Sequence, residues 1–174
     1  TCLGCRPDQT FCVSDAVRSH FGVVQEKGAA AESDWLEGFD AYRRAHPDLA
    51  DQWVNAMSGH LPADWDAEVP TFAPAQGPLA TRSASGTVLN AIARRLPTLM
   101  GGSADLAPSN KTFLNGEAEF QKETHQGRNI RFGVREHAMG AILNGLYLHN
   151  GIRPYGGTFL VFADYMQIGR ASCR

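Results

Sequence analysis

The apolar positions from residue 81 onward alternate between a helical and an extended spacing. The elements that this pattern predicts are, in chain order, a helix over 81–96, a short strand beginning at Thr98, a strand over 128–134, a helix over 136–150, a short strand over 152–157 and a helix beginning at Thr158. Helices and strands that alternate in this order are typical of an α/β fold with a parallel sheet flanked by helices.

The first third of the chain has a different pattern, with helical spacing only. Residues 32–45 predict one helix, with Ser33 as its N-cap, and a second helix extends to Met57 and ends at Gly59. Pro47 separates them because proline disfavours a helical residue before it. We therefore expect a helical hairpin whose aromatic residues pack in a core. These are Trp35, Phe39, Tyr42 and Trp53.

Residues 60–80 are rich in proline and alanine and have no clear period, which favours a linker between two domains. This divides the chain into an N-terminal helical part, 1–59, and an α/β part, 81–167. The last residues, 168–174, have the sequence IGRASCR, which fits no element and resembles a translated sequencing adapter. We expect this tail to be non-native and the chain to be a fragment.

Composition and charge exclude several classes of protein. The 174 residues have a formal net charge of −2, which leaves no basic surface for nucleic acid, and no apolar run has the length of about 20 residues that spans a membrane. The four cysteines all lie near the two ends, which favours a reducing compartment and hence the cytoplasm. Cys2 and Cys5 form a lone C-x-x-C pair, which only Cys12 and His20 could complete into a zinc site.

Two carboxylates follow predicted strands. Asp105 lies in the loop after the first strand, and Glu136 begins the helix after the second. Because sites in parallel sheets form at the carboxyl ends of strands, both residues are candidates to face a ligand. The alternatives are a turn aspartate and a glutamate stabilised by the helix dipole. Arg82 and Ser109 could bind an anion such as a phosphate ester, or belong to solvated loops.

Three aromatic residues, Phe159, Phe162 and Tyr165, recur every third position in the last predicted helix. On one helix face they would form a stripe that either packs in the core or makes a flat slot for an aromatic ring. Gly156 and Gly157 precede the stripe and would allow close approach of the backbone to a ligand.

Four stretches together resemble the transketolase family. They are TRSAS at 81–85, GGSADLAPSN at 101–110, FGVREHAMGAILNG at 132–145 and PYGGTFLVFADYM at 154–166. The order and spacing of these stretches match the family, and the resemblance covers roughly residues 13–167. It implies an incomplete thiamine diphosphate-binding fold. The chain would contain the end of the diphosphate-binding domain, the linker and the first part of the pyrimidine-binding domain.

The resemblance implies thiamine diphosphate as cofactor and assigns roles to several residues. Glu136 matches the glutamate that hydrogen-bonds a ring nitrogen of the aminopyrimidine and favours the imino tautomer, which accepts the proton of the thiazolium carbon. Asp105 and Leu106 match residues that approach a cofactor held mainly by the other subunit. The aromatic pocket for the pyrimidine corresponds to Phe159, Phe162 and Tyr165.

The implied reaction transfers a two-carbon ketol unit from a ketose phosphate to an aldose phosphate, as in the pentose phosphate pathway. Arg82 and Ser109 match residues that hold the sugar phosphate. The family's active site lies at a homodimer interface. A divalent metal, Mg²⁺ or Ca²⁺, would have its ligands outside this chain. We therefore expect the isolated chain to be inactive.

Three alternatives remain. An enzyme of the deoxyxylulose phosphate synthase type shares the strand-end glutamate but would be expected to differ at GGSADLAPSN. A dihydroxyacetone synthase uses formaldehyde as acceptor, whereas Arg82 and Ser109 favour a phosphorylated sugar. The third alternative is a non-catalytic truncated product that has kept the fold.

Overall fold

The computed structural model describes residue 8 and residues 10–167. By its internal contacts the chain divides into two compact units, with the boundary in the sequence after Asp51, and each is described by itself. The predicted tail over 168–174 and the pair Cys2 and Cys5 lie outside the described residues.

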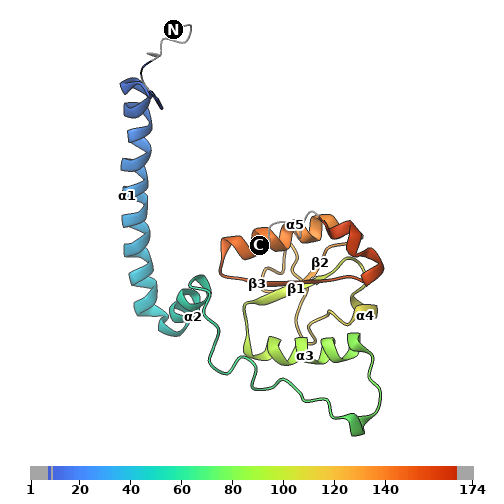
Figure 1. Cartoon of the computed structure of the whole chain (residues 1–174). Coiled ribbons are helices and arrows are strands. Elements are labelled where there is room, and N and C mark those ends of the chain that lie inside the picture. Colours follow the sequence, from blue (N-terminus) through green and yellow to red (C-terminus); the bar gives the residue numbers. More distant parts are fainter. Residues whose placement is uncertain (1–7, 9, 168–174) are drawn as a thin grey trace. The chain divides into compact units, whose positions relative to one another are not determined.

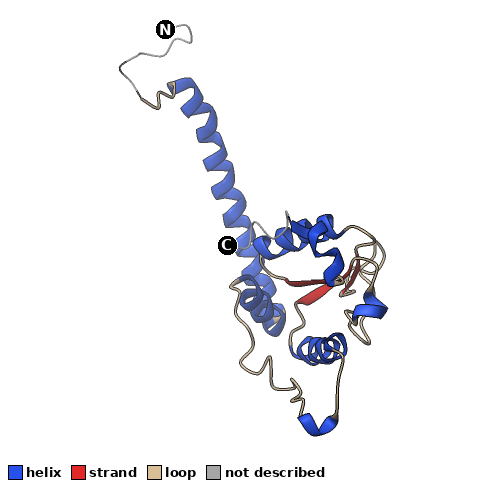
Figure 2. Ribbon diagram, turned by 45° about the vertical axis from the view of Figure 1, so that its right-hand side comes forward, coloured by secondary structure: helices blue, strands red, loops and turns tan. Residues whose placement is uncertain are grey.

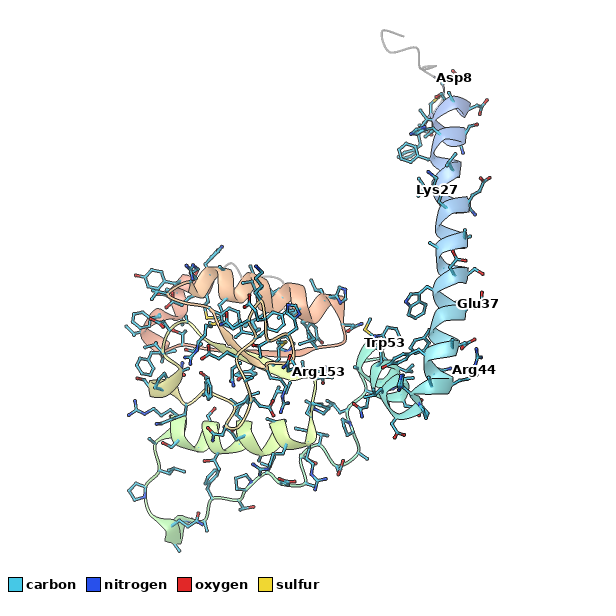
Figure 3. The ribbon with its side chains drawn as sticks, turned by 180° about the vertical axis from the view of Figure 1, so that it is seen from behind. Asp8, Lys27, Glu37, Arg44, Trp53 and Arg153 are labelled. Carbon is cyan, nitrogen blue, oxygen red and sulfur yellow. The ribbon has the colours of Figure 1, made fainter. Side chains whose placement is uncertain are left out.

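The first unit consists mainly of one long helix, α1, over Asp15–Ala45. Its N-cap is Ser14, whose hydroxyl accepts a hydrogen bond from the amide of Val17 at 3.4 Å, so the expectation that Ser33 caps the helix is wrong. The helix begins earlier because Ser14 caps it, Asp15 places a favourable negative charge in the first turn, and Ala29–Ala31 continue it into residue 32. Figure 3 shows side chains projecting from α1, Lys27, Glu37 and Arg44 among them.

The aromatic residues of α1 do not lie in a core, since no residue of this helix is buried in the described chain. They stack on one another instead. The rings of Trp35 and Phe39 are nearly parallel, with centroids 5.2 Å apart, and Phe39 and Tyr42 follow at 6.4 Å. Arg43 lies over the Phe39 ring. The predicted break is confirmed, because α1 ends at Ala45 and α2 covers Pro47–Met57.

Within the second unit, residues 60–80 contain no described strand and only one short 3₁₀ turn, η1, over Pro74–Gln76. The segment is nevertheless anchored. Glu68 accepts hydrogen bonds from Arg94 and Arg95 at 2.5 and 2.8 Å, and Arg95 also pairs with Asp64 at 2.8 Å. The carboxylates of the predicted linker thus bind the C-terminal end of the following helix, where basic residues also suit the helix dipole.

The rest of the second unit is a parallel sheet between helices, as the pattern predicts (Figure 1). Three parallel strands occur in the order β2-β1-β3. The helix α3 lies on one face of the sheet and α5 on the other. The bounds are α3 Thr81–Arg95, β1 Leu99–Ser103, α4 Ala107–Asn110, β2 Asn129–Arg131, α5 Glu136–His149, β3 Arg153–Gly157 and the 3₁₀ helix η2 Leu160–Met166.

Helices lie on both sides of the strands (Figure 2). Apolar residues are buried on both faces of this sheet. Leu96 and Leu99 pack with Leu114 on the α3 side, and Phe132 packs with Met139 on the α5 side. Burial of such side chains stabilises the fold by about 1.5–3 kcal/mol each. Arg153, at the start of β3, donates a hydrogen bond to the carbonyl of Gly59 and so ties the segment after α2 to the sheet (Figure 3).

The glycines of the GGSADL motif lie inside β1 and not in the loop after it. A Cβ atom on Gly101 would collide with the carbonyl oxygen of Tyr155, and one on Gly102 with that of Ile130. The side chains of Leu143 and Met139 occupy the space beside Gly156. These glycines therefore allow close packing within the protein. For Gly156 this differs from the expectation that the glycine pair before the aromatic stripe allows approach by a ligand.

The second strand is shorter than the pattern predicts. β2 ends at Arg131, and Gly133, with a φ of +67°, turns the chain into α5. Phe132 is buried, but Val134 is 76% exposed because this turn interrupts the alternation. The last predicted helix is present as the 3₁₀ helix η2.

Candidate functional site

A cavity of about 540 Å³ opens at the carboxyl edge of the sheet. The loop after β1, the turn after β2, the start of α5 and the 3₁₀ helix η2 all contribute to its wall. The lining residues are Ala104, Asp105, Leu106, Val134, Glu136, Phe162 and Tyr165. This is the edge at which parallel α/β sheets bind ligands.

The position of Glu136 follows from the turn before it. The amide of Arg135 donates to the carbonyl of Gly133 at 2.8 Å, and the Arg135 guanidinium donates to the carbonyl of Phe132 at 3.0 Å. The amide of Met139 then donates to the carbonyl of Arg135 at 2.8 Å and starts α5. Glu136 is therefore held in the first turn of α5, just after the turn at Gly133 that follows β2.

The Glu136 side chain is buried, with 8% exposed, and it lines the cavity. Within the described chain its carboxylate has no side-chain hydrogen bond or ion pair. The positive end of the α5 dipole favours a negative charge at this position. A buried carboxyl group is normally hydrogen-bonded. This one is therefore suited to form a hydrogen bond with a ligand in the cavity.

Asp105 faces the same cavity from the loop after β1. Its backbone is left-handed, with φ +61°, a conformation in which aspartate is several-fold enriched among non-glycine residues. Leu106 follows and caps the short helix α4. Asp105 and Glu136, predicted from separate strand ends, thus meet at one cavity.

Two of the three predicted aromatic residues line the cavity. Phe162 and Tyr165 belong to η2, and their ring centroids are 6.4 Å apart with a 44° angle between the planes. Since a 3₁₀ helix has three residues per turn, the spacing of three places them on one face. Phe159 precedes η2, and its carbonyl accepts from the amide of Phe162 at 2.9 Å, but it is not among the lining residues.

The predicted anion-binding residues lie outside this lining. Arg82 is exposed in the first turn of α3, and Ser109 is exposed in α4. The two helices contact each other, and α4 begins directly after Leu106. The structure therefore places Ser109 one short helix away from the cavity.

The lining also includes Ala104 and Val134, which the sequence analysis does not single out as site residues. An apolar residue at or directly after the carboxyl end of a strand is the signal that could have identified them. Behind the wall, Ser103 and Asn110 form a buried hydrogen bond that has no sequence signature.

Among the described residues, no group of three or more histidine, cysteine, aspartate or glutamate side chains is placed to hold a metal ion. None of the helices in the described ranges has the length and apolar character needed to cross a membrane.

Family models match both parts of the chain. Residues 77–173 match the transketolase pyrimidine binding domain, and residues 1–62 match the transketolase thiamine diphosphate binding domain. The first model covers more than half of the chain and contains every residue that lines the cavity.

Three relatives show the extent of the similarity. A transketolase from Geobacillus stearothermophilus is 51% identical over 160 residues, which are 91% of this chain and 24% of that protein. The chloroplastic transketolase-1 of Arabidopsis thaliana is 48% identical over 162 residues, which are 92% of this chain and 22% of that protein.

A solved Pichia stipitis transketolase in complex with sedoheptulose 7-phosphate superposes with a TM-score of 0.88 at 38% identity, over 96% of this chain and 26% of that one. The chain spans about a quarter of the length of these relatives. The architecture, the cavity at the sheet edge and these similarities lead to one conclusion: the chain belongs to the transketolase family.

Proposed function

We propose that this chain supplies the pyrimidine side of an active site that transfers a two-carbon ketol unit from a ketose phosphate to an aldose phosphate. The observation that carries the proposal is the buried Glu136 carboxylate, which faces a cavity walled by Phe162 and Tyr165. A carboxylate beside aromatic rings is suited to hold a flat heterocycle that offers a ring nitrogen.

The residues present fit one half of thiamine diphosphate. Glu136 could hydrogen-bond the aminopyrimidine, while Phe162, Tyr165 and Leu106 supply apolar contact with its ring. The lining contains no arginine or lysine for the diphosphate. The diphosphate and its Mg²⁺ or Ca²⁺ would thus be bound by residues other than this lining.

When bound, the cofactor supplies a carbanion that can attack a ketose carbonyl. The residues of this chain would hold a hydrogen bond to the cofactor and exclude water from it. Glu136 would hold a hydrogen bond at a carboxylate oxygen, and the aromatic wall would keep water from that bond, which strengthens it. Asp105 would orient the ligand from the opposite loop.

Arg82 and Ser109 are the proposed contacts for the sugar phosphate. A guanidinium binds phosphate oxygens bidentately, and a hydroxyl adds a further donor. The Pichia stipitis relative in complex with sedoheptulose 7-phosphate supports a sugar phosphate as substrate. A dihydroxyacetone synthase, which uses formaldehyde, would have no use for these two residues at the acceptor.

The working form would be a homodimer with the active site at the interface. Around the cavity, large apolar side chains are exposed, with 76% of Val134, 90% of Leu160 and 66% of Tyr165 accessible. A group of exposed apolar residues at the rim of a cavity is typical of an interaction surface. We further propose that the enzyme acts in the pentose phosphate pathway and in the cytoplasm.

A chimera tests the proposal. Residues 13–167 would replace the matching segment of the Geobacillus stearothermophilus transketolase, and transfer from xylulose 5-phosphate to ribose 5-phosphate would be compared with transfer to formaldehyde. We expect a dimer that prefers ribose 5-phosphate, and no activity from residues 1–174 alone. A folded chimera that transfers no ketol unit would refute the proposed function, and a preference for formaldehyde would favour the dihydroxyacetone synthase alternative.

A further inference from the structure

A series of hydrogen bonds, buried at its centre and partly buried at both ends, begins at Ser103, next to Ala104 of the cavity lining. The Thr112 hydroxyl donates to Oδ1 of Asn110 at 2.7 Å, and Nδ2 of Asn110 donates to Oγ of Ser103 at 2.7 Å. Ser103 in turn donates to the carbonyl of Gly157 at 2.8 Å. These hydrogen bonds therefore connect α4 and the end of β1 to the end of β3.

Ser103 uses its whole hydrogen-bonding capacity in this arrangement. A hydroxyl has one donor and two acceptor positions. Besides donating to Gly157, it accepts from Asn110 and from the amide of Leu106, the latter at 3.1 Å. Ser103 is only 3% exposed and Asn110 only 9%, so water cannot readily replace a lost partner.

The bond to Leu106 constrains the residue before it. Asp105 lies between Ser103 and Leu106 and has the left-handed backbone, with φ +61°. A non-glycine residue keeps such a conformation only when its surroundings hold it there. The residue after Asp105 is held by the Ser103 hydroxyl, which accepts from the amide of Leu106. The residue before it is held because the amide of Ala104 donates to the carbonyl of Gly157 at 3.2 Å.

We propose that Ser103 and Asn110 are positioning residues that act through Asp105, because their hydrogen bonds hold the loop Ala104–Leu106 against the cavity. This inference rests on the proposed function. Without these bonds the Asp105 backbone would relax toward negative φ, and its carboxylate would leave the cavity wall. Neither Ser103 nor Asn110 lines the cavity.

The test uses the chimera and two readouts, the Kd of thiamine diphosphate by titration calorimetry and the kcat and KM for the ketose donor. Ser103→Ala removes the central hydroxyl, and Asn110→Asp keeps the shape but loses the donor to Ser103. We expect both to weaken cofactor binding by about tenfold, a loss of one well-formed contact.

Tyr155→Phe is the matched control. It removes the hydrogen bond from the Tyr155 hydroxyl to the carbonyl of Thr112, at 2.8 Å, without touching the loop Ala104–Leu106. We expect it to lower the melting temperature but leave the Kd within about twofold of the parent, because this bond does not constrain Asp105. If Ser103→Ala prevents folding, Asn110→Asp and Thr112→Val, which removes only the outermost bond, still decide the question.

A double-mutant cycle separates positioning from general stability. Glycine adopts positive φ freely and has no carboxylate, so Ser103→Ala should have little further effect on the Kd in an Asp105→Gly background. A full effect in that background, or an effect no larger than that of Tyr155→Phe, overturns the inference while the parent chimera still binds cofactor. A parent chimera that binds no thiamine diphosphate overturns the proposed function together with this inference.

Discussion

Asp105 and Glu136 line the same cavity from the ends of two adjacent parallel strands. Asp105 lies in the loop after β1, and Glu136 opens the helix after β2. Glu136 is buried, whereas Asp105 is exposed. This difference suits two roles, since a buried carboxylate interacts strongly with a hydrogen-bonded ligand and an exposed one can contact a ligand or a partner chain.

Replacement of Glu136 should abolish most activity and leave the fold intact. Within the described chain its carboxylate has no side-chain partner, so Glu136→Gln and Glu136→Ala remove no native hydrogen bond. Loss of a proton-transfer group lowers rates by about 10²–10⁴-fold, and we expect kcat of the chimera to fall within this range. The measurement is steady-state ketol transfer together with thermal unfolding.

Glu123→Gln is the control for this prediction, because Glu123 is exposed and lies outside the cavity lining. It should change neither kcat nor the melting temperature. Turnover close to that of the parent in Glu136→Ala would show that this carboxylate has no part in the proton transfer.

Substitutions at Asp105 can separate its charge from its backbone conformation. Asparagine also adopts the left-handed region, so Asp105→Asn should fold normally and lose only the charge-dependent contact. Asp105→Val should in addition destabilise the protein, by about 1–3 kcal/mol, because a β-branched residue is strained at positive φ. Denaturant unfolding and cofactor titration of both variants provide the comparison, and equal stability of the two would contradict the strain argument.

The two phenylalanines near η2 should differ in their effect on cofactor binding. Phe162 lines the cavity and Phe159 does not. Phe162→Leu should therefore raise the Kd of thiamine diphosphate by about three- to tenfold through loss of aromatic contact, whereas Phe159→Leu should affect mainly stability. Calorimetric titration of both variants tests this. A larger loss of binding in Phe159→Leu than in Phe162→Leu would mean that the pyrimidine contacts Phe159 and not Phe162.

Arg128 should contribute more to stability than its surface neighbours. Its guanidinium donates to the carbonyls of Ala93 and Leu96 at 3.0–3.2 Å and pairs with Glu117 at 2.6 Å. It thus caps the end of α3 by donating to the Ala93 carbonyl in the last turn, while the Leu96 carbonyl at the C-cap also accepts from the amide of Leu99 at 3.0 Å. Arg128→Met should cost about 2–4 kcal/mol in unfolding free energy, since buried acceptors lose their donor. A cost below that of exposed Arg131→Met would refute the capping role.

The Glu117 partner should make this contribution depend on pH. The hydrogen bond from Arg128, and next its positive charge, lower the pKa of Glu117 below its ordinary value of 4.5, although partial burial opposes the shift. Because the folded-state pKa is depressed, the stabilisation is present above about pH 4.5 and is lost as the pH falls through the folded value.

Glu117→Gln should therefore lower stability at pH 7 by about 0.5–1 kcal/mol, allowing for solvent screening, and this deficit should shrink as the pH falls below 4.5 through the folded-state pKa. Melting temperatures of this variant and of Glu123→Gln, measured across that range, provide the check. A deficit in Glu117→Gln that persists undiminished at the lowest pH would contradict the ion-pair explanation.

Hydrophobic spacing along the chain is sufficient to predict the α/β class, the parallel sheet and the strand ends that carry Asp105 and Glu136. Spacing identifies these features because helical and extended periods are local properties of the chain. It also places the break at Pro47, since proline restricts its own neighbours. The role of Ser33 and the length of β2 were not predictable in this way, because caps and turns depend on a few residues with positive φ or side-chain bonds.

Tertiary structure alone decides which predicted residues share a wall. Phe162 and Tyr165 line the cavity, but Phe159, Arg82 and Ser109 do not, although all five occur in stretches that resemble the family. Likewise only the packing of β1 between β2 and β3 explains Gly101 and Gly102, and only the folded chain brings Asn110 to Ser103. The physical reason is the same in each case: these contacts join segments far apart in the chain, and no local pattern encodes their distances.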